Sequence, residues 1–391
     1  MQTFEDLIFD YNLDFFEPIV VGVSFGPDSM ALLDRLITIG FKKVFVAHIH
    51  HGLRKASDDE EKCLRQFCLE KNIPIYVHHL EPIKDYSNLE DQLRGARYTF
   101  FQQIYHSVKA QALFLGHHAN EQVEVGLKRI FEGASLASLS GMRTKTFLNE
   151  MWVYRPQLFE QKDFLIGYLE KKKIPSAIDP TNFDGPCLRA KMRSKMIPFL
   201  EEIFEKKIQG NVLRFMGEMR ELELYLGKKV EGAMNSSIGG PYGNFFPKEA
   251  LDPLENFELD FLLTKAGIRL HETKNRIIGH LRKNDFGKKV IDTSTLAFIE
   301  KKGLFILKQE LKPNVLFFEQ PRKGWLSFWK GESGYFNPKK KGDWIPVSKL
   351  NATCRKKIFK RYSEQKIPIF LRNFVYVLEH QGKVIYEFLT L

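Results

Sequence analysis

Residues 19–29 read Ile-Val-Val-Gly-Val-Ser-Phe-Gly-Pro-Asp-Ser, an apolar run that passes through a turn into a helical pattern. Residues 19–24 predict a buried strand, because short apolar runs bounded by turn residues are typical of strands covered on both faces. Residues 28–39 predict a helix. The turn would gather backbone N–H groups at the helix N-terminus, where proteins commonly bind anions. The residues of this predicted anion site are Ser24, Phe25, Gly26, Pro27, Asp28 and Ser29.

The same turn has a simpler interpretation. Asp28 or Ser29 could merely cap the helix at an ordinary strand–turn–helix junction. If the turn does hold phosphates, Asp28 is placed to help bind Mg²⁺, which prefers carboxylate and phosphate oxygens.

Strands and helices keep alternating along the first half of the chain. Further strands are predicted at residues 44–49, 75–79, 112–116 and 152–155, with helices at 57–71, 88–108 and 120–131. Such alternation predicts a parallel sheet covered on both faces, the doubly wound α/β class. Ligands of these sheets bind beyond the carboxyl ends of the strands, which here means after residues 24, 49 and 116.

The pattern changes beyond residue 155, where long helical stretches precede short strand-like pieces. Because 391 residues exceed one ordinary core, we expect several domains. The expected division is a catalytic domain at 1–205, a mainly helical domain at 206–311 and a small basic α+β domain at 312–391.

The composition narrows the class of protein. A formal net charge of +11 is consistent with a polyanionic partner such as RNA, although many basic proteins bind none. The four cysteines form no C-x-x-C pair, which argues against zinc ribbons and iron–sulfur clusters and fits a reducing cytoplasm. No apolar run reaches the roughly 18 residues of a membrane span, and residues 1–6 do not begin a signal peptide.

Three histidines, His48, His50 and His51, lie at the end of the second predicted strand, within residues 47–54. A metal site is not favoured, because the segment is extended and no acid or cysteine within it completes a ligand set. We expect instead a loop fixed by Gly52, with Arg54 facing phosphate or nucleotide and His48 belonging to the same nucleotide site.

The fourth predicted strand leads into the stretch richest in reactive side chains. His117 and His118 occupy the turn, where they could contact phosphate or relay a proton. Glu121 and Glu124 lie three residues apart on the predicted helix and would share a face. Ordinary polarity at a helix start is the alternative.

Arginines on two other helices complete the candidate set. Arg97 lies near one helical face with Glu90 and Arg94, and Arg189 and Arg193 have i, i+4 spacing. Such arginines suit RNA phosphates or the charge of a transition state, and equally a solvated face.

In this order, the stretches resemble the tRNA(Ile)-lysidine synthases of the PP-loop, or N-type ATP pyrophosphatase, superfamily. The family's S-G-G-x-D-S loop is matched by residues 24–29, its H-x-N-H-G-L-R signature by 48–54, its N-L-E…A-R-x-x-R-Y-x-F-F helix by 88–101 and its A-H-H-x-D-D-Q-x-E-T stretch by 116–125. The resemblance is strong to about residue 198, faint in the middle and renewed near 367–388.

Several positions depart from the family pattern. Phe25 replaces a loop glycine, which is costly if φ is positive and harmless if φ is negative with the ring pointing away. Asn120 and Glu121 replace two aspartates, so the carboxylate role is assigned to Glu121, with Glu124 beside it. His50 replaces an asparagine.

The resemblance implies a two-step ligation. ATP would adenylate the C2 oxygen of the wobble cytidine of tRNA(Ile) with a CAU anticodon, and free L-lysine would then displace AMP to give lysidine. Asp28 and Glu121 would hold Mg²⁺, with His117 or His118 near the phosphates. Arg97 and Arg189 would stabilise charge or position RNA. The alternatives are a degenerate tRNA-binding protein and another PP-loop modifying enzyme such as a thiolase. A homodimer is left open.

A basic segment near the carboxyl end supports an RNA partner. Only Asp343 opposes its cations, which are Lys339, Lys340, Lys341, Lys349, Arg355, Lys356, Lys357, Lys360 and Arg361. A solvated lysine-rich surface would have the same composition.

Charge reversal at Lys356, Lys357 and Lys360 should weaken tRNA binding. Each lost phosphate contact should flatten the slope of log K against log salt by roughly 0.7–0.9, because fewer counterions are released. Binding titrations at several salt concentrations measure the slope, and an unchanged slope would place the RNA elsewhere.

Overall fold

The structure is a computed structural model. It describes residues 3–50, 52, 56–80, 89–177, 188–240, 242–293, 295–308, 325–330, 343–381 and 383–386. Two units make up the chain: Met1–Ala134 with Ser138–Met219, and Ser135–Ala137 with Arg220–Leu391. The finer division at residues 205 and 311 stays a prediction.

A six-stranded sheet with the order β3-β2-β1-β4-β6-β5 forms the centre of the first unit. Its strands are β1 (Ile19–Gly22), β2 (Val44–His50), β3 (Ile75–His79), β4 (Ala112–Leu115), β5 (Lys145–Leu148) and β6 (Met151–Tyr154). Neighbouring strands are parallel except for β5, which pairs antiparallel with β6. The predicted parallel α/β sheet is therefore confirmed.

Strand β5 was not predicted from the sequence. It forms a hairpin with β6 through Asn149 and Glu150, which both have positive φ, at 48° and 60°. Two-residue hairpin turns need such backbone angles, but they usually use glycine. Because neither turn residue is a glycine, this hairpin had no signal in the sequence.

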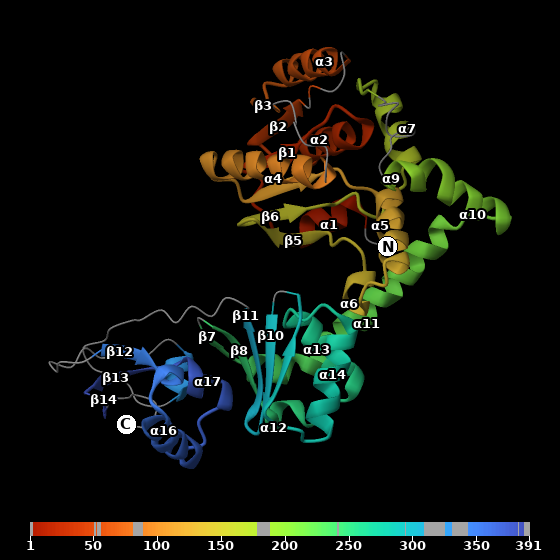
Figure 1. Cartoon of the computed structure of the whole chain (residues 1–391). Helices are drawn as coiled ribbons and strands as arrows, with labels where there is room; N and C mark the ends of the chain where they lie inside the picture. Colours follow the sequence, from red (N-terminus) through yellow and green to blue (C-terminus); the bar gives the residue numbers. More distant parts are fainter. Residues whose placement is uncertain are drawn as a thin grey trace. The chain divides into compact units, whose positions relative to one another are not determined.

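Helices cover both faces of the sheet (Figure 1). They include α1 (Phe4–Asp10), α2 (Pro27–Ile39), α3 (Ala56–Glu70), α4 (Leu89–Ser107) and α7 (Lys162–Lys172). Ile19 and Val21 belong to one apolar cluster with side chains of α1, α2, α3 and α7, whereas Val20 belongs to another with α4. Because successive strand residues point to opposite faces, β1 is buried on both sides, as its apolar run predicts.

The remaining helices of the first unit follow the sheet. They are α5 (Ala119–Phe131), α9 (Leu188–Lys191), the π-helical turn η1 (Met192–Met196) and α10 (Ile197–Ile203). Ala119, Val123 and Leu127 of α5 share a small core with Met192 and Ile197. Helix α6 (Leu136–Leu139) and the long α11 (Gln209–Asn235) each contain residues of both units.

The second unit contains a five-stranded antiparallel sheet and a three-stranded one. The first has the order β7-β8-β11-β10-β9, and its strands are β7 (Ile238–Gly240), β8 (Gly243–Pro247), β9 (Lys288–Ile291), β10 (Thr295–Glu300) and β11 (Gly303–Lys308). The second contains β12 (Asp343–Pro346), β13 (Tyr376–His380) and β14 (Lys383–Tyr386). The helices are α12 (Lys248–Leu251), α13 (Asn256–Lys265), α14 (His271–Arg282), α15 (Trp325–Trp329), η2 (Val347–Lys349), α16 (Ala352–Glu364) and α17 (Ile369–Phe374).

The two faces of the five-stranded sheet belong to different apolar cores. Phe246 packs in a cluster with residues of α13 and α14, while its neighbour Phe245 packs with Trp329, Tyr362 and Phe370. The segments after residue 311 therefore complete the core of the sheet that precedes them.

The three charge-reversal positions lie exposed on α16, whereas Lys339, Lys340 and Lys341 lie outside the described residues. Among the helices that the structure describes, none is both long and apolar enough to cross a membrane.

The turn between β1 and α2 contains a strained residue. Phe25 has φ 66°, a conformation that costs a non-glycine residue about 1–3 kcal/mol. Its ring is only 5% exposed and belongs to the core that α1, α2 and α7 cover. Burial of a phenylalanine contributes about 1.5–3 kcal/mol, which offsets the strain. The backbone carbonyl of Phe25 accepts a hydrogen bond from the N–H of Ala177 at 2.9 Å.

Phe25 therefore combines the two cases weighed from the sequence: φ is positive, and the ring points into the core. Phe25→Ala should lower the free energy of unfolding by about 3–5 kcal/mol. Phe25→Gly should lower the free energy of unfolding by about 1 kcal/mol less than Phe25→Ala does, because glycine adopts a positive φ without steric cost. Urea unfolding of the full chain measures both variants. If the alanine variant were the more stable, the backbone at residue 25 could not have positive φ.

Candidate functional site

Serine hydroxyls close the turn after β1. The Ser24 N–H donates to Ser29 Oγ at 3.1 Å, and the Gly26 N–H donates to Ser24 Oγ at 3.3 Å. The Ser29 hydroxyl in turn donates to the Gly26 carbonyl at 3.0 Å. Pro27 begins α2, where its missing N–H has no partner to lose. The turn thus has the predicted form of a closed loop at a helix N-terminus.

A cavity of about 180 Å³ opens beside this turn, and we call it the loop cavity. Its lining residues are Gly22, Val23, Ser24, Asp28, Ser29, Ala47, Ile49, Arg97, Phe101, Leu115, Gly116, His117 and Glu121. It lies at the carboxyl ends of β1 and β4, where the strand order reverses direction, as expected for a ligand site of this sheet class.

Two glycines keep this end of the sheet open. A Cβ at Gly116 would lie 3.0 Å from the backbone carbonyl of Asp28, and one at Gly22 would lie 2.7 Å from the Leu115 side chain. Larger residues would push β4 away from α2 or fill the cavity. The sequence placed Gly116 in a reactive stretch, but it gave no signal that Gly22 lines the site.

Asp28 and Glu121 bring two half-buried carboxylates to the loop cavity. Burial raises the pKa of Asp28, and the Glu121 charge raises it further against the opposing His118 and Lys162. Burial would also raise the pKa of Glu121, but His117, His118 and the His118 N–H outweigh it and hold that pKa below its usual value. Asp28 Oδ1 is buried and has no hydrogen-bond partner among the described residues.

His117 and Arg97 provide the other polar groups of this cavity. Burial lowers the pKa of His117 to about 4, so its ring is neutral near pH 7. A neutral ring favours hydrogen bonding to a ligand over the predicted proton relay, since an efficient base has a pKa near the working pH. Burial also lowers the pKa of Arg97, yet an arginine in a protein stays charged.

A second cavity of about 410 Å³, the basic cavity, shares Arg97 and His117 with the first. Its other lining residues are Leu93, Arg94, Tyr98, Val125, Lys128, Arg129, Glu132, Met142, Arg155 and Arg189. Six arginines and lysines thus line this cavity with one acid, Glu132, so the charge of its lining is complementary to an anion.

Sequence reasoning assigned no role to Lys128, Arg129 or Arg155. Arg155 is 5% exposed and follows β6, and its guanidinium donates to the Arg143 carbonyl at 3.1 Å and to Thr146 Oγ1 at 3.3 Å. Arg155 could have been predicted as a site residue, because ligands of such sheets bind beyond the carboxyl ends of the parallel strands.

Several predicted site residues line neither cavity. Glu124 is buried, and its carboxylate accepts hydrogen bonds from the Arg193 guanidinium at 2.7 and 3.0 Å. The position of Glu124 therefore assigns it to holding α5 against η1, and the predicted catalytic role has no support from it. Burial lowers the pKa of His48, and its Nδ1 lies 2.8 Å from the Val23 carbonyl. His48 thus braces the strand that leads into the turn.

His118, too, lies outside the cavity lining, at the N-cap of α5. Its N–H donates to Glu121 Oε2 at 3.3 Å, and its Nε2 lies 3.6 Å from Asp28 Oδ2. The backbone N–H of His118 therefore orients Glu121, and its ring lies beside Asp28. Phe25, Gly26 and Pro27 shape the turn without lining a cavity.

Arg54 falls outside the described residues. Asn120, the substituted aspartate position, lies away from both cavities. Its amide donates to Gln209 at 2.9 Å and accepts from the Lys162 N–H at 3.1 Å. The missing charge at residue 120 therefore removes nothing from the loop cavity.

Residues 4–200 match the family model of the PP-loop domain. The tRNA(Ile)-lysidine synthase of Chlamydia caviae is 37% identical over 225 residues, 57% of this chain and 71% of the relative. That of Protochlamydia amoebophila is 29% identical over 408 residues, 96% of this chain and 89% of the relative. Among solved structures, a U34-tRNA thiolase from Methanococcus maripaludis is 16% identical, with a TM-score of 0.42 over 56% of this chain and 80% of its own. With a PP-loop match over half its length and such relatives, this chain belongs to the tRNA(Ile)-lysidine synthase family of PP-loop proteins.

Proposed function

We propose that this protein uses ATP to ligate free L-lysine to C2 of the wobble cytidine, position 34, of tRNA(Ile) with a CAU anticodon. The product, lysidine, would change the decoding of the tRNA from methionine to isoleucine. The observation that carries the proposal is that the loop cavity and the basic cavity meet at Arg97 and His117. A nucleotide in the first cavity and an RNA base entering from the second would meet at that junction.

The first step would join the C2 oxygen of the cytidine to the α-phosphorus of ATP and release pyrophosphate. Negative charge grows on the leaving pyrophosphate. Backbone N–H groups at the start of α2, the Ser24 hydroxyl and the Arg97 guanidinium lie around the cavity and would stabilise this charge. Because they are fixed before the reaction, little reorganisation is needed.

Mg²⁺ fits this site. Asp28 and Glu121 offer carboxylate oxygens, the ligands that Mg²⁺ prefers, and Asp28 Oδ1 has no other partner among the described residues. A bound Mg²⁺ would neutralise charge on the phosphates. Meanwhile the hydrogen bond from the His118 N–H keeps Glu121 oriented toward the cavity.

In the second step the neutral ε-amine of lysine would attack C2, and AMP would leave with the C2 oxygen. The amine must lose a proton before or during attack. The basic cavity suits RNA phosphate better than the lysine ammonium, since six cations line it against one acid. We therefore assign Arg94, Lys128, Arg155 and Arg189 to the tRNA.

Neither alternative gains support from the site. The ring and the carbonyl of Phe25 both point away from the loop cavity, so this substitution does not mark a decayed loop. Of the cysteines that the structure describes, Cys63, Cys68 and Cys354, none lines either cavity, so the described residues give the thiolase alternative no support.

Incubation of the protein with tRNA(Ile), ATP, Mg²⁺ and lysine should convert the wobble cytidine to lysidine, measured by mass spectrometry of digested nucleosides. Without lysine, pyrophosphate should still be released as the adenylated tRNA forms. A tRNA with a different anticodon is the control. Tight tRNA binding with no new nucleoside would instead indicate a degenerate protein, and incorporated sulfur a thiolase.

Glu121→Gln and Glu124→Gln form a matched pair on one helix. Glu121→Gln should reduce kcat for lysidine formation by at least about 100-fold, because it removes a charge from the reacting site, while tRNA affinity stays near normal. Glu124→Gln should leave the rate within a few-fold but lower the free energy of unfolding by about 1.5–3 kcal/mol, since it removes the negative charge and one of the two oxygens that accept from Arg193. Turnover retained by the Glu121 variant would remove Glu121 from catalysis.

A further inference from the structure

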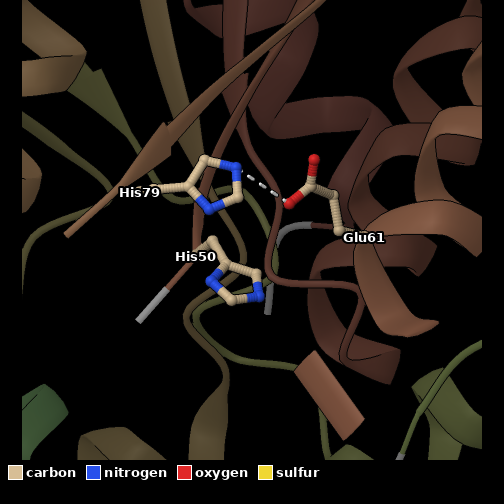
Figure 2. Close-up of side chains that lie close together, drawn as sticks. All are labelled: His50, Glu61 and His79. Carbon is tan, nitrogen blue, oxygen red and sulfur yellow. Dashed lines mark ion pairs between the residues drawn. The ribbon is translucent and has the colours of Figure 1, made fainter. Parts of the chain in front are cut away.

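His50 and His79 lie side by side at the carboxyl ends of two neighbouring strands. They are directly paired in the parallel register of β2 and β3, so both side chains point to the same face of the sheet. Their ring centroids are 4.7 Å apart (Figure 2). In the sequence, His50 lies close to His48 and His51. In the structure, the ring beside it is that of His79, which comes from the neighbouring strand β3.

An acid from α3 completes the group. Glu61 Oε2 lies 3.3 Å from His79 Nε2, and one ligand atom from each of His50, Glu61 and His79 lies within 4.8 Å of the other two (Figure 2). The other Glu61 oxygen accepts a hydrogen bond from Arg65 Nε at 2.8 Å, which orients the carboxylate. Sequence reasoning considered only acids within residues 47–54 and did not connect Glu61 with the histidines, because Glu61 is remote from them in the sequence.

His50 is a buried side chain with an unsatisfied nitrogen. Its side chain is 7% exposed, and Nε2 has no hydrogen-bond partner among the described residues. Asp58 Oδ1 lies 3.0 Å from Nε2 but outside the direction of a hydrogen bond. A buried nitrogen without a hydrogen-bond partner destabilises the folded state unless a bound ligand interacts with it.

We propose that His50, Glu61 and His79, with Asp58 as fourth ligand, bind a divalent transition-metal ion of the zinc type. Imidazole nitrogens and carboxylate oxygens are common zinc ligands, and four of them give the usual tetrahedral set. Two carboxylates and two neutral imidazoles balance the charge of the ion. The imidazoles select a transition metal over Mg²⁺, which prefers oxygen.

His50, Glu61 and His79 can close on an ion with small movements, and Asp58, which lies next to His50, would have to move to join them. Ligand atoms at about 2.0–2.2 Å from zinc must approach one another more closely than they do here. His79 and Asp58 have side chains that are 62% and 68% exposed, so both have room to move, while His50 and Glu61 are held by burial and by Arg65.

This metal site is separate from the loop cavity, since none of its four residues lines either cavity. The ion would link the start of α3 to the ends of β2 and β3. His50 and Asp58 also lie on either side of the sequence segment that contains Arg54, so the ion would fix both ends of that segment. Its role would be structural and independent of whether the protein ligates lysine.

Zinc titration of the full-length, chelator-treated protein tests the site. The wild-type protein should bind one equivalent of Zn²⁺ with a rise in Tm, and millimolar Mg²⁺ should not displace it. His50→Asn and His79→Ala should each weaken zinc binding at least tenfold. His106→Ala is the matched control, because His106 is an exposed histidine of α4 outside the group. This variant should bind zinc with the wild-type affinity.

Cobalt provides a second measurement that does not depend on stability. Co²⁺ bound to the wild-type protein should give the visible absorption of a four-coordinate site, and His79→Ala, which alters an exposed residue, should abolish it. Absence of stoichiometric zinc binding by the wild-type protein would overturn the proposal. So would affinities of the His50 and His79 variants equal to that of the control.

Discussion

The site depends on how the backbone turns between β1 and α2. Phe25 adopts a positive φ, its ring is anchored in the core, and its carbonyl is held by the Ala177 N–H. The hydroxyls of Ser24 and Ser29 close the rest of the turn. The contacts of Phe25 hold its ring and its carbonyl away from the loop cavity, whereas Ser24 and Ser29 line that cavity. The cost of the strained backbone is offset by burial of a large apolar ring.

Burial then decides how the charged groups behave around that turn. It lowers the pKa of His117 and raises that of Asp28, because desolvation disfavours the charged form of each. Glu121 stays ionised because two histidines and a backbone N–H surround it. The result is a small cavity lined by two carboxylates, a neutral imidazole and a guanidinium, of which the imidazole and the guanidinium also line the basic cavity.

Much of this arrangement could be predicted from the sequence. The parallel sheet followed from alternating apolar and amphipathic stretches, and the cavity position followed from the rule for strand ends. Ser24, Asp28, Arg97, His117 and Glu121 were each placed by local motifs and do line the loop cavity. The roles that could not be predicted depend on contacts between residues far apart in the sequence. Glu124 binds Arg193, and His50 lies close to Glu61 and His79.

By itself, the sequence determined the class of sheet, the turn that begins at Ser24 and the order of motifs that marks the family. These are local properties, since they depend on periodicity and on residues adjacent along the chain. Only the tertiary structure decided that the Phe25 ring leaves the loop cavity open, that Arg155 joins the basic cavity, and that an acid completes the histidine pair. Those outcomes depend on which side chains from distant segments share a face, and on the desolvation that packing imposes on them.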